Sequence, residues 1–86
     1  MTNQIFNRKQ ITFVYFTSMG QKINLPIYCI KTNIFAQIGE KLYKEYLEYR
    51  ETNNYFLFNG KQILRFKSIE DNKIGSGFPV IIYKLV

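Results

Sequence analysis

Apolar and polar side chains alternate with the two-residue period of a β-strand in the first part of the chain. Residues 11–16 are rich in β-branched and aromatic side chains, and residues 17–20 supply turn chemistry. Ile23, Leu25 and Ile27 then alternate with polar or turn-type neighbours, so we predict a β-hairpin with one buried face. Two alternating sets in the first strand compete for that face, and we favour the set Thr12, Val14 and Phe16 over the set Ile11, Phe13 and Tyr15.

The spacing of apolar residues becomes helical after the hairpin. The apolar positions are three or four residues apart at Phe35, Ile38, Leu42 and Tyr46 or Leu47. Thr32 or Asn33 precedes them, and either side chain accepts hydrogen bonds from the free amides of a first helical turn. The pattern therefore predicts a helix that runs to about Tyr49. Three tyrosines fall three residues apart on it and suit either the edge of the core or a contact surface, of which we favour the core edge: Tyr43, Tyr46 and Tyr49.

The second half of the chain returns to strand-like runs. Residues 55–58 and 61–64 flank Asn59-Gly60, the dipeptide that best tolerates the positive φ angles of a tight hairpin turn. Ser68 and Asp71 have the spacing of a helical cap, so a short helical turn is expected there. A glycine-containing bend at residues 75–77 then leads into an apolar strand at residues 80–86.

The resulting order is strand, strand, helix, strand, short strand, helical turn and strand. A helix that connects an antiparallel hairpin to a further strand of the same sheet must lie on one face of that sheet. We therefore predict an α+β β-grasp with a mixed sheet of four to five strands and one main helix packed on one face. Residues 11–86 form this single domain, and residues 1–10 form an N-terminal extension.

Residues 55–63 (Tyr-Phe-Leu-Phe-Asn-Gly-Lys-Gln-Ile) resemble the ubiquitin-like family. The stretch around Ser68 and Asp71, Ile74, and the run at residues 80–83 extend the resemblance over about 30 residues, and the first hairpin is similar with one residue inserted at its turn. The resemblance implies an apolar, protein-binding patch on the exposed face of the sheet, with Lys61 and Arg65 at its rim. The matching positions of the patch are Leu57, Gly60, Ile81 and Tyr83.

The chain ends at Leu85-Val86, where conjugated members of the family continue into Gly-Gly. The resemblance therefore implies a member that is not conjugated to other proteins. A modifier whose tail is unseen or processed is an alternative.

Candidate catalytic chemistry is sparse. The chain has no histidine, so the usual neutral-pH general base and the commonest zinc ligand are both missing. Cys29 is the single cysteine, and we interpret it as a structural thiol. The acidic residues form no pair on an apolar face. We expect no enzymatic activity, no cofactor, no metal and no small-molecule substrate.

The formal charge of +6 and the pI near 9.6 favour anionic partners. An RNA partner is our second choice, in which a basic ubiquitin-like component of a ribonucleoprotein contacts phosphates through the candidate anion-binding residues Arg50, Lys61, Arg65 and Lys67. A single cysteine favours an intracellular protein, cytoplasmic or nuclear, and no run of about 20 apolar residues predicts a membrane span. Our first expectation is a non-catalytic, protein-binding adaptor or complex subunit.

Overall fold

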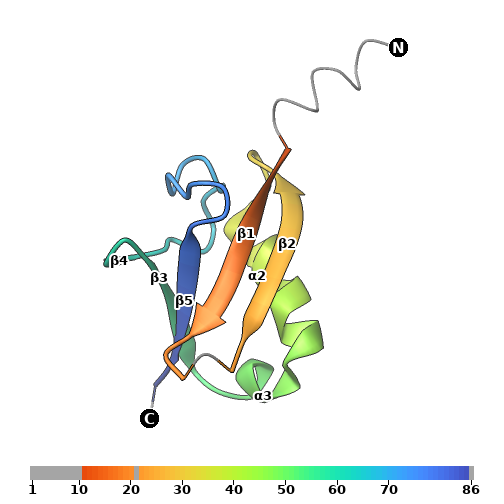
Figure 1. Ribbon diagram of the computed structural model, residues 1–86, viewed down its shortest axis with the longest axis vertical. Helices are drawn as coiled ribbons and strands as arrows, with labels where there is room; N and C mark the ends of the chain where they lie inside the picture. Colours follow the sequence, from red (N-terminus) through yellow and green to blue (C-terminus); the bar gives the residue numbers. More distant parts are fainter. Residues whose placement is uncertain (1–10, 21, 86) are drawn as a thin grey trace.

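The computed structural model describes residues 11–20 and 22–85 (Figure 1). The predicted N-terminal extension at residues 1–10 and the terminal residue Val86 lie outside the described part. The elements follow the order β1 (Ile11–Ser18), β2 (Asn24–Ile30), α2 (Phe35–Glu45), α3 (Leu47–Arg50), β3 (Asn54–Phe58), β4 (Lys61–Gln62) and β5 (Pro79–Lys84).

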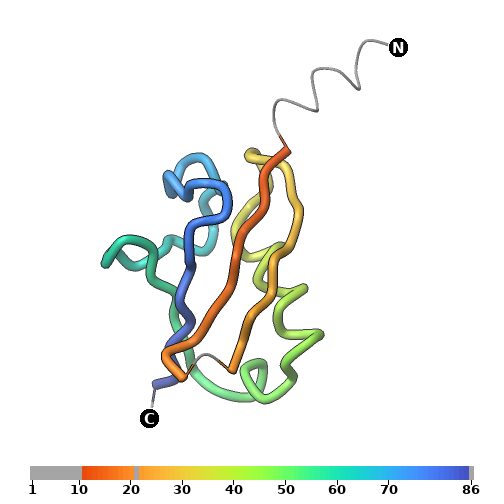
Figure 2. Tube along the Cα trace, viewed as in Figure 1, coloured from red at the N-terminus to blue at the C-terminus, as the bar shows by residue number. Residues whose placement is uncertain are grey.

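The five strands form one mixed sheet in the order β2-β1-β5-β3-β4. β1 pairs antiparallel with β2 and parallel with β5, and β3 pairs antiparallel with both β5 and β4. Figures 1 and 2 show α2 crossing behind the sheet, so that the opposite face is left uncovered by any helix. This is the predicted β-grasp, with the helix packed on one face of the sheet.

The core lies between this helix and the inner face of the sheet. The predicted inward set of β1 is confirmed, because Thr12, Val14 and Phe16 are buried while the alternate positions are not. Three phenylalanines from different elements form the centre, with ring centroids 4.9 to 6.0 Å apart and near edge-to-face geometry: Phe16, Phe35 and Phe56. Such aromatic pairs add roughly 0.5–1.5 kcal/mol each beyond the area that they bury.

The helix starts differently from the prediction. Neither Thr32 nor Asn33 caps it, because the Asn33 carboxamide oxygen instead accepts the amide of Ile30 at 2.8 Å. The first helical amides, those of Phe35 and Ala36, donate to main-chain carbonyls of residues 67 and 65 at 2.9 and 2.8 Å. The cap therefore comes from a segment about 30 residues further along the chain.

The helix also ends earlier than predicted. Tyr46 has φ −129° and ψ 78°, which ends α2 at Glu45, and α3 then adds a single turn. Residues six apart on a continuous helix point about 120° away from each other. The break allows Tyr49 as well as Tyr43 to enter the core, and both are buried while Tyr46 packs against the core. The predicted place of these tyrosines at the core edge is confirmed.

Two local predictions in the second half are confirmed. Asn59 and Gly60 have φ angles of 52° and 77°, as a tight hairpin turn requires. The Ser68 hydroxyl accepts the amide of Asp71 at 3.0 Å, and the chain makes hydrogen-bonded turns there without a full helix. The strand after the hairpin is shorter than expected, because β4 ends at Gln62 and the side chain of Ile63 turns into the core.

Candidate protein-binding surface

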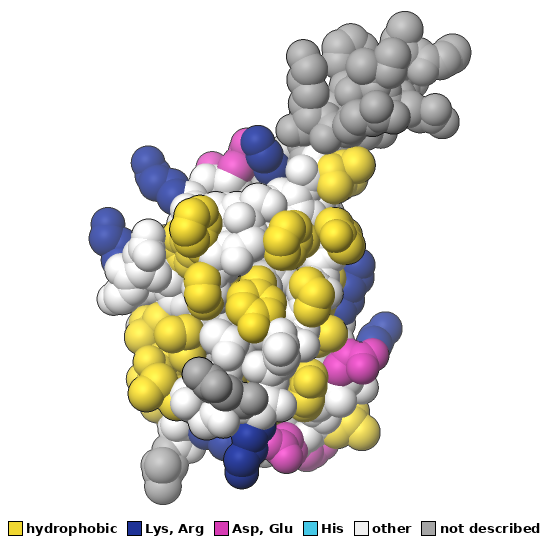
Figure 3. Space-filling model, viewed as in Figure 1, with side chains coloured by type: hydrophobic (Ala, Val, Ile, Leu, Met, Phe, Trp, Pro, Cys, Tyr) yellow, Lys and Arg dark blue, Asp and Glu magenta, His cyan; other side chains and the backbone are white. Residues whose placement is uncertain are grey.

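The uncovered face of the sheet is built by strand alternation, because residues directly opposite each other on paired strands share a face. We call it the outer sheet face. It comprises Ile11, Phe13, Tyr15 and Thr17 of β1, Asn24, Pro26, Tyr28 and Ile30 of β2, Tyr55 and Leu57 of β3, Gln62 of β4, and Pro79, Ile81 and Tyr83 of β5. Every one of these residues is uncharged. Figure 3 views this side of the molecule, with hydrophobic side chains spread over the centre and charged ones near the margin.

The structure brings together three of the predicted patch residues. Leu57 lies opposite Ile81 on the paired strands β3 and β5, and Tyr83 lies opposite Tyr55 two residues further along. The two tyrosine rings are stacked, with centroids 5.3 Å apart and planes 12° from parallel. All four side chains are partly exposed, so they are neither sealed in the core nor free in solvent.

The other predicted patch residues lie at one edge of the sheet. Gly60 forms the β3–β4 turn, and Lys61 is the first residue of the two-residue edge strand. Both are exposed. Lys61 lies opposite the buried Phe58, so by alternation its side chain is on the inner side of the sheet and not at the rim of the outer sheet face as predicted.

The prediction missed the half of the face formed by β1 and β2. Phe13 and Tyr28 are a cross-strand pair with ring centroids 5.4 Å apart, and Tyr28 is 70% exposed. The sequence signal was present, because the alternating set of β1 that does not enter the core is itself Ile11, Phe13 and Tyr15.

A groove of about 500 Å³ lies between the two halves of the outer sheet face. Its walls come from β1, β2, β5 and the first hairpin turn: Tyr15, Thr17, Ser18, Met19, Ile23, Asn24, Pro79 and Ile81. Met19 is exposed, and its sulfur accepts a hydrogen bond from the Tyr83 hydroxyl at 3.4 Å. The groove is therefore continuous with the predicted patch through shared Ile81 and neighbouring Tyr83.

The edges of the sheet are poor sites for adding a strand from another protein. The amide and carbonyl of Ile30 both form hydrogen bonds with Asn33, so they point away from β1. Because this orientation recurs at every second residue of a strand, the main-chain groups of Tyr28, Pro26 and Asn24 also point to the open edge of β2. Proline places no N–H on this open edge, which weakens pairing with a further strand. The opposite edge strand, β4, has only two residues. The flat face is thus better suited to a partner than either edge.

Charge is distributed unevenly between the two sides of the molecule. All six acidic residues of the chain lie in residues 40–51 or at positions 70 and 71, so no strand carries one. Basic residues lie near the ends of the β1–β2 hairpin, including Lys22 in the first turn and Lys31 after β2. A partner that approaches this face meets an uncharged centre with both basic and acidic side chains at the margin of the view in Figure 3.

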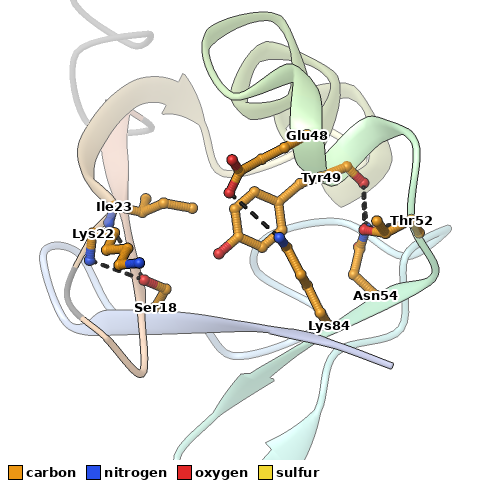
Figure 4. Close-up of polar contacts among 8 residues, drawn as sticks. All are labelled: Ser18, Lys22, Ile23, Glu48, Tyr49, Thr52, Asn54 and Lys84. Atoms are coloured by element: carbon orange, nitrogen blue, oxygen red, sulfur yellow. Dashed lines mark hydrogen bonds and ion pairs between the residues drawn. The ribbon is translucent and has the colours of Figure 1, made fainter. Parts of the chain in front are cut away.

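Lys84 at the end of β5 is engaged with the helical side of the molecule. Its Nζ atom lies 3.4 Å from a carboxylate oxygen of Glu48 and 4.7 Å from the ring centroid of Tyr49 (Figure 4). In the same view the Ser18 hydroxyl oxygen accepts the amides of Lys22 and Ile23 and so fixes the first turn. These contacts hold the end of the outer sheet face that carries Tyr83 and Met19.

The candidate anion-binding residues do not form one cluster. Arg50 and Arg65 line the same groove on another side of the molecule, whereas Lys61 lines a different groove. Lys67 is exposed, and its carbonyl receives the first amide of α2. Arg65 is half-buried and hydrogen-bonds to Asn54 and to the Tyr43 hydroxyl on the helical side of the sheet. The prediction that it lies at the rim of the exposed patch was therefore wrong, and it has a structural role that the sequence did not indicate.

Cys29 is the single cysteine of the chain, and its thiol is free and buried. Burial raises the pKa of the Cys29 thiol, and the positive charge of Lys41 lowers it by a smaller amount. Within residues 11–20 and 22–85, no three side chains of His, Cys, Asp or Glu come together as metal ligands. No helix in that part of the chain is long and apolar enough to cross a membrane.

No protein-family model matches the sequence, and no curated protein sequence matches it. Among solved structures, the chain is similar to a designed protein based on ubiquitin, with a TM-score of 0.72. That similarity covers 87% of this chain and 89% of the designed one, at 12% sequence identity. The likeness thus concerns the backbone arrangement, and it shows that this chain has the ubiquitin-like β-grasp fold.

Proposed function

We propose that this protein is a non-catalytic, ubiquitin-like adaptor or complex subunit that binds a partner protein through its outer sheet face. The observation that carries the proposal is the composition of that face, on which every outward position of the five strands is uncharged and many are aromatic or aliphatic. Contiguous exposed apolar surface of this kind is typical of interaction sites in soluble proteins.

The contact is centred on Leu57, Ile81 and Tyr83. Tyrosine suits the centre of an interface because it buries a large area while fixing few rotatable bonds. The stacked ring of Tyr55 already restrains Tyr83, so less conformational entropy is lost when a partner covers it.

Charge complementarity describes the partner further. The chain carries a formal net charge of +6 and its outer sheet face has no acidic residue, so the partner surface combines an apolar centre with acidic residues at its margin. Apolar burial supplies most of the affinity, while the surrounding charge sets orientation and the rate of association. Such a contact takes place inside the cell, in the cytoplasm or nucleus.

The test is affinity purification from the native cell with matched variants. The double variant Leu57→Asp with Ile81→Asp places two charges in the centre of the outer sheet face. The control, Leu47→Asp with Leu64→Asp, makes the same chemical change at two exposed leucines outside that face. Folding of both variants is verified by circular dichroism.

We expect specific partners to be retained by the wild type and by the control variant and lost by the Leu57/Ile81 variant. If a folded Leu57/Ile81 variant recovers the same proteins as the wild type, this surface is not the binding site.

A further inference from the structure

A groove beside the end of the helical segment differs in charge from four other grooves of the described residues. It has a volume of about 330 Å³ and is lined by Tyr43, Arg50, Thr52, Asn53, Asn54, Arg65 and Leu85. We call it the arginine groove, because two arginines and no acidic residue line it. Three other grooves combine lysines with an acidic residue, and the groove on the outer sheet face has no charged residue.

The guanidinium of Arg65 is held in place by neutral acceptors. One terminal nitrogen donates to the Asn54 carbonyl and to the Asn54 side-chain oxygen at 2.6 and 2.8 Å, and the other donates to the Tyr43 hydroxyl at 3.1 Å. The Tyr43 hydroxyl in turn donates to the Asn54 side-chain oxygen at 2.7 Å. These bonds fix the guanidinium without neutralising its charge, and within residues 11–20 and 22–85 no carboxylate forms an ion pair with it.

The Arg65 guanidinium also packs against an aromatic ring of the core. The central carbon of the Arg65 guanidinium lies 5.1 Å from the centroid of the buried Phe56 ring. A guanidinium fixed before binding loses little conformational entropy when it meets a ligand. It still has donors left over, because a guanidinium carries five N–H groups and three hydrogen bonds are made here.

The second arginine is positioned but weakly restrained. Arg50 donates to a carboxylate oxygen of Glu40 at 3.3 Å, and both side chains are about half exposed. Exposed ion pairs of this kind contribute little, so Arg50 is able to exchange Glu40 for another anion at small cost. Glu40 therefore acts as a competitor for any anion in the groove.

We propose that the arginine groove binds a phosphate group through Arg50 and Arg65. Arginine forks match the oxygen geometry of phosphate and form charge-assisted hydrogen bonds with it. The exposed side chain of Asn53 adds an amide donor at the same groove. Lys61 and Lys67 are not part of this site, so only two of the four basic residues predicted to contact anions contribute to it.

The test is a titration of the folded chain, followed by two-dimensional ¹⁵N NMR. Sodium phosphate is added at constant ionic strength, with sodium chloride as the balancing salt, so that general charge screening stays fixed. A parallel titration with O-phosphoserine distinguishes a phosphoryl group carried on a protein from free phosphate. We expect saturable shifts at the amides of residues 50–54 and at the Arg65 side chain.

Four variants separate this site from general attraction to a basic protein. Arg50→Gln weakens phosphate binding by about tenfold, because one charged donor is lost. Lys67→Gln makes the same change in net charge outside the groove and leaves the affinity for phosphate unchanged. Glu40→Gln removes the competitor and tightens binding about two- to fivefold, whereas Glu45→Gln, a matched change on the exposed side of α2, does not.

Chemical shifts that do not saturate with phosphate, or equal losses of phosphate affinity in Arg50→Gln and Lys67→Gln, would overturn the proposal. Arg65 would then have a purely structural role. An equal gain of phosphate affinity in Glu40→Gln and Glu45→Gln would also overturn the proposal, because the gain would then depend on net charge alone. Tighter binding of O-phosphoserine than of phosphate supports a ligand on a modified protein. Equal binding supports free phosphate.

Discussion

The carboxamide of Asn72 holds the segment that follows β4 in place, and its removal is a sharp test of the fold. Its oxygen accepts the amide of Leu64 at 2.8 Å, and its nitrogen donates to the carbonyls of Leu64 and Ser68, both at 3.0 Å. A weaker contact reaches the carbonyl of Lys67 at 3.4 Å. The Leu64 amide depends on this side chain, whereas the carbonyls of Leu64 and Ser68 also accept the main-chain amides of Lys67 and Asn72.

We predict that Asn72→Ala lowers the free energy of unfolding by about 2–3 kcal/mol. Three well-formed hydrogen bonds contribute roughly 0.5–1.5 kcal/mol each, and partial access of water reduces the total. The same segment supplies the carbonyls of Arg65 and Lys67 that cap α2, so loosening it also weakens a helix start. Loss of a helix cap typically costs about 1 kcal/mol.

Urea unfolding measures the change directly, and thermal unfolding should show a fall in the midpoint of roughly 4–8 °C for each kcal/mol. Asn53→Ala is the matched control, because the Asn53 side chain makes no hydrogen bond to any residue in the described ranges 11–20 and 22–85. The control should change stability by less than about 0.5 kcal/mol. A loss below 0.5 kcal/mol in Asn72→Ala as well would refute the assigned role.

Three further predictions test separate features. Gly60→Ala should destabilise the chain by about 1 kcal/mol in urea unfolding, since Gly60 has φ +77°, whereas Gly20→Ala, at a site with ordinary contacts, should not. Pro26→Thr restores an N–H to the open edge of β2, so sedimentation velocity should show concentration-dependent self-association absent from wild type; a strictly monomeric variant would contradict this. Burial raises the pKa of the Cys29 thiol, so the thiol ionises at a lower pH in the unfolded chain than in the folded one, and the free energy of unfolding should fall above about pH 9. Cys29→Ala should lose this pH dependence. If the free energy of unfolding falls equally with pH in the variant, other groups cause the fall.

Features set by neighbouring residues were predicted well from the sequence. The alternation around Val14 located the inner face of β1, and Asn59-Gly60 located the second hairpin, because both depend on local backbone preferences. The resemblance of residues 55–63 to ubiquitin-like proteins added an expected exposed patch on the strands β3 and β5. Leu57 and Ile81 were predicted to share the exposed face, and the structure places them directly opposite each other.

Features set by distant residues were not predictable in the same way. The prediction of a side-chain cap at Thr32 or Asn33 was wrong, since nothing local indicates that the carbonyls of residues 65 and 67 reach the helix start. The break at Tyr46 depends on how Tyr49 fits the core, which spacing alone does not reveal. The position of Arg65 over Phe56 likewise requires the tertiary arrangement.

The capping of α2 by residues 65 and 67 also constrains the order in which the chain acquires structure. An isolated helix of 11 residues is marginal in water, because nucleation fixes several dihedral angles for the first hydrogen bond. Its first amides find partners only after the intervening chain has closed a loop of about 30 residues, which has an entropic cost. A peptide of residues 31–51 should therefore be mostly random coil by circular dichroism, and the rate-limiting step in folding should involve the two ends of this loop meeting.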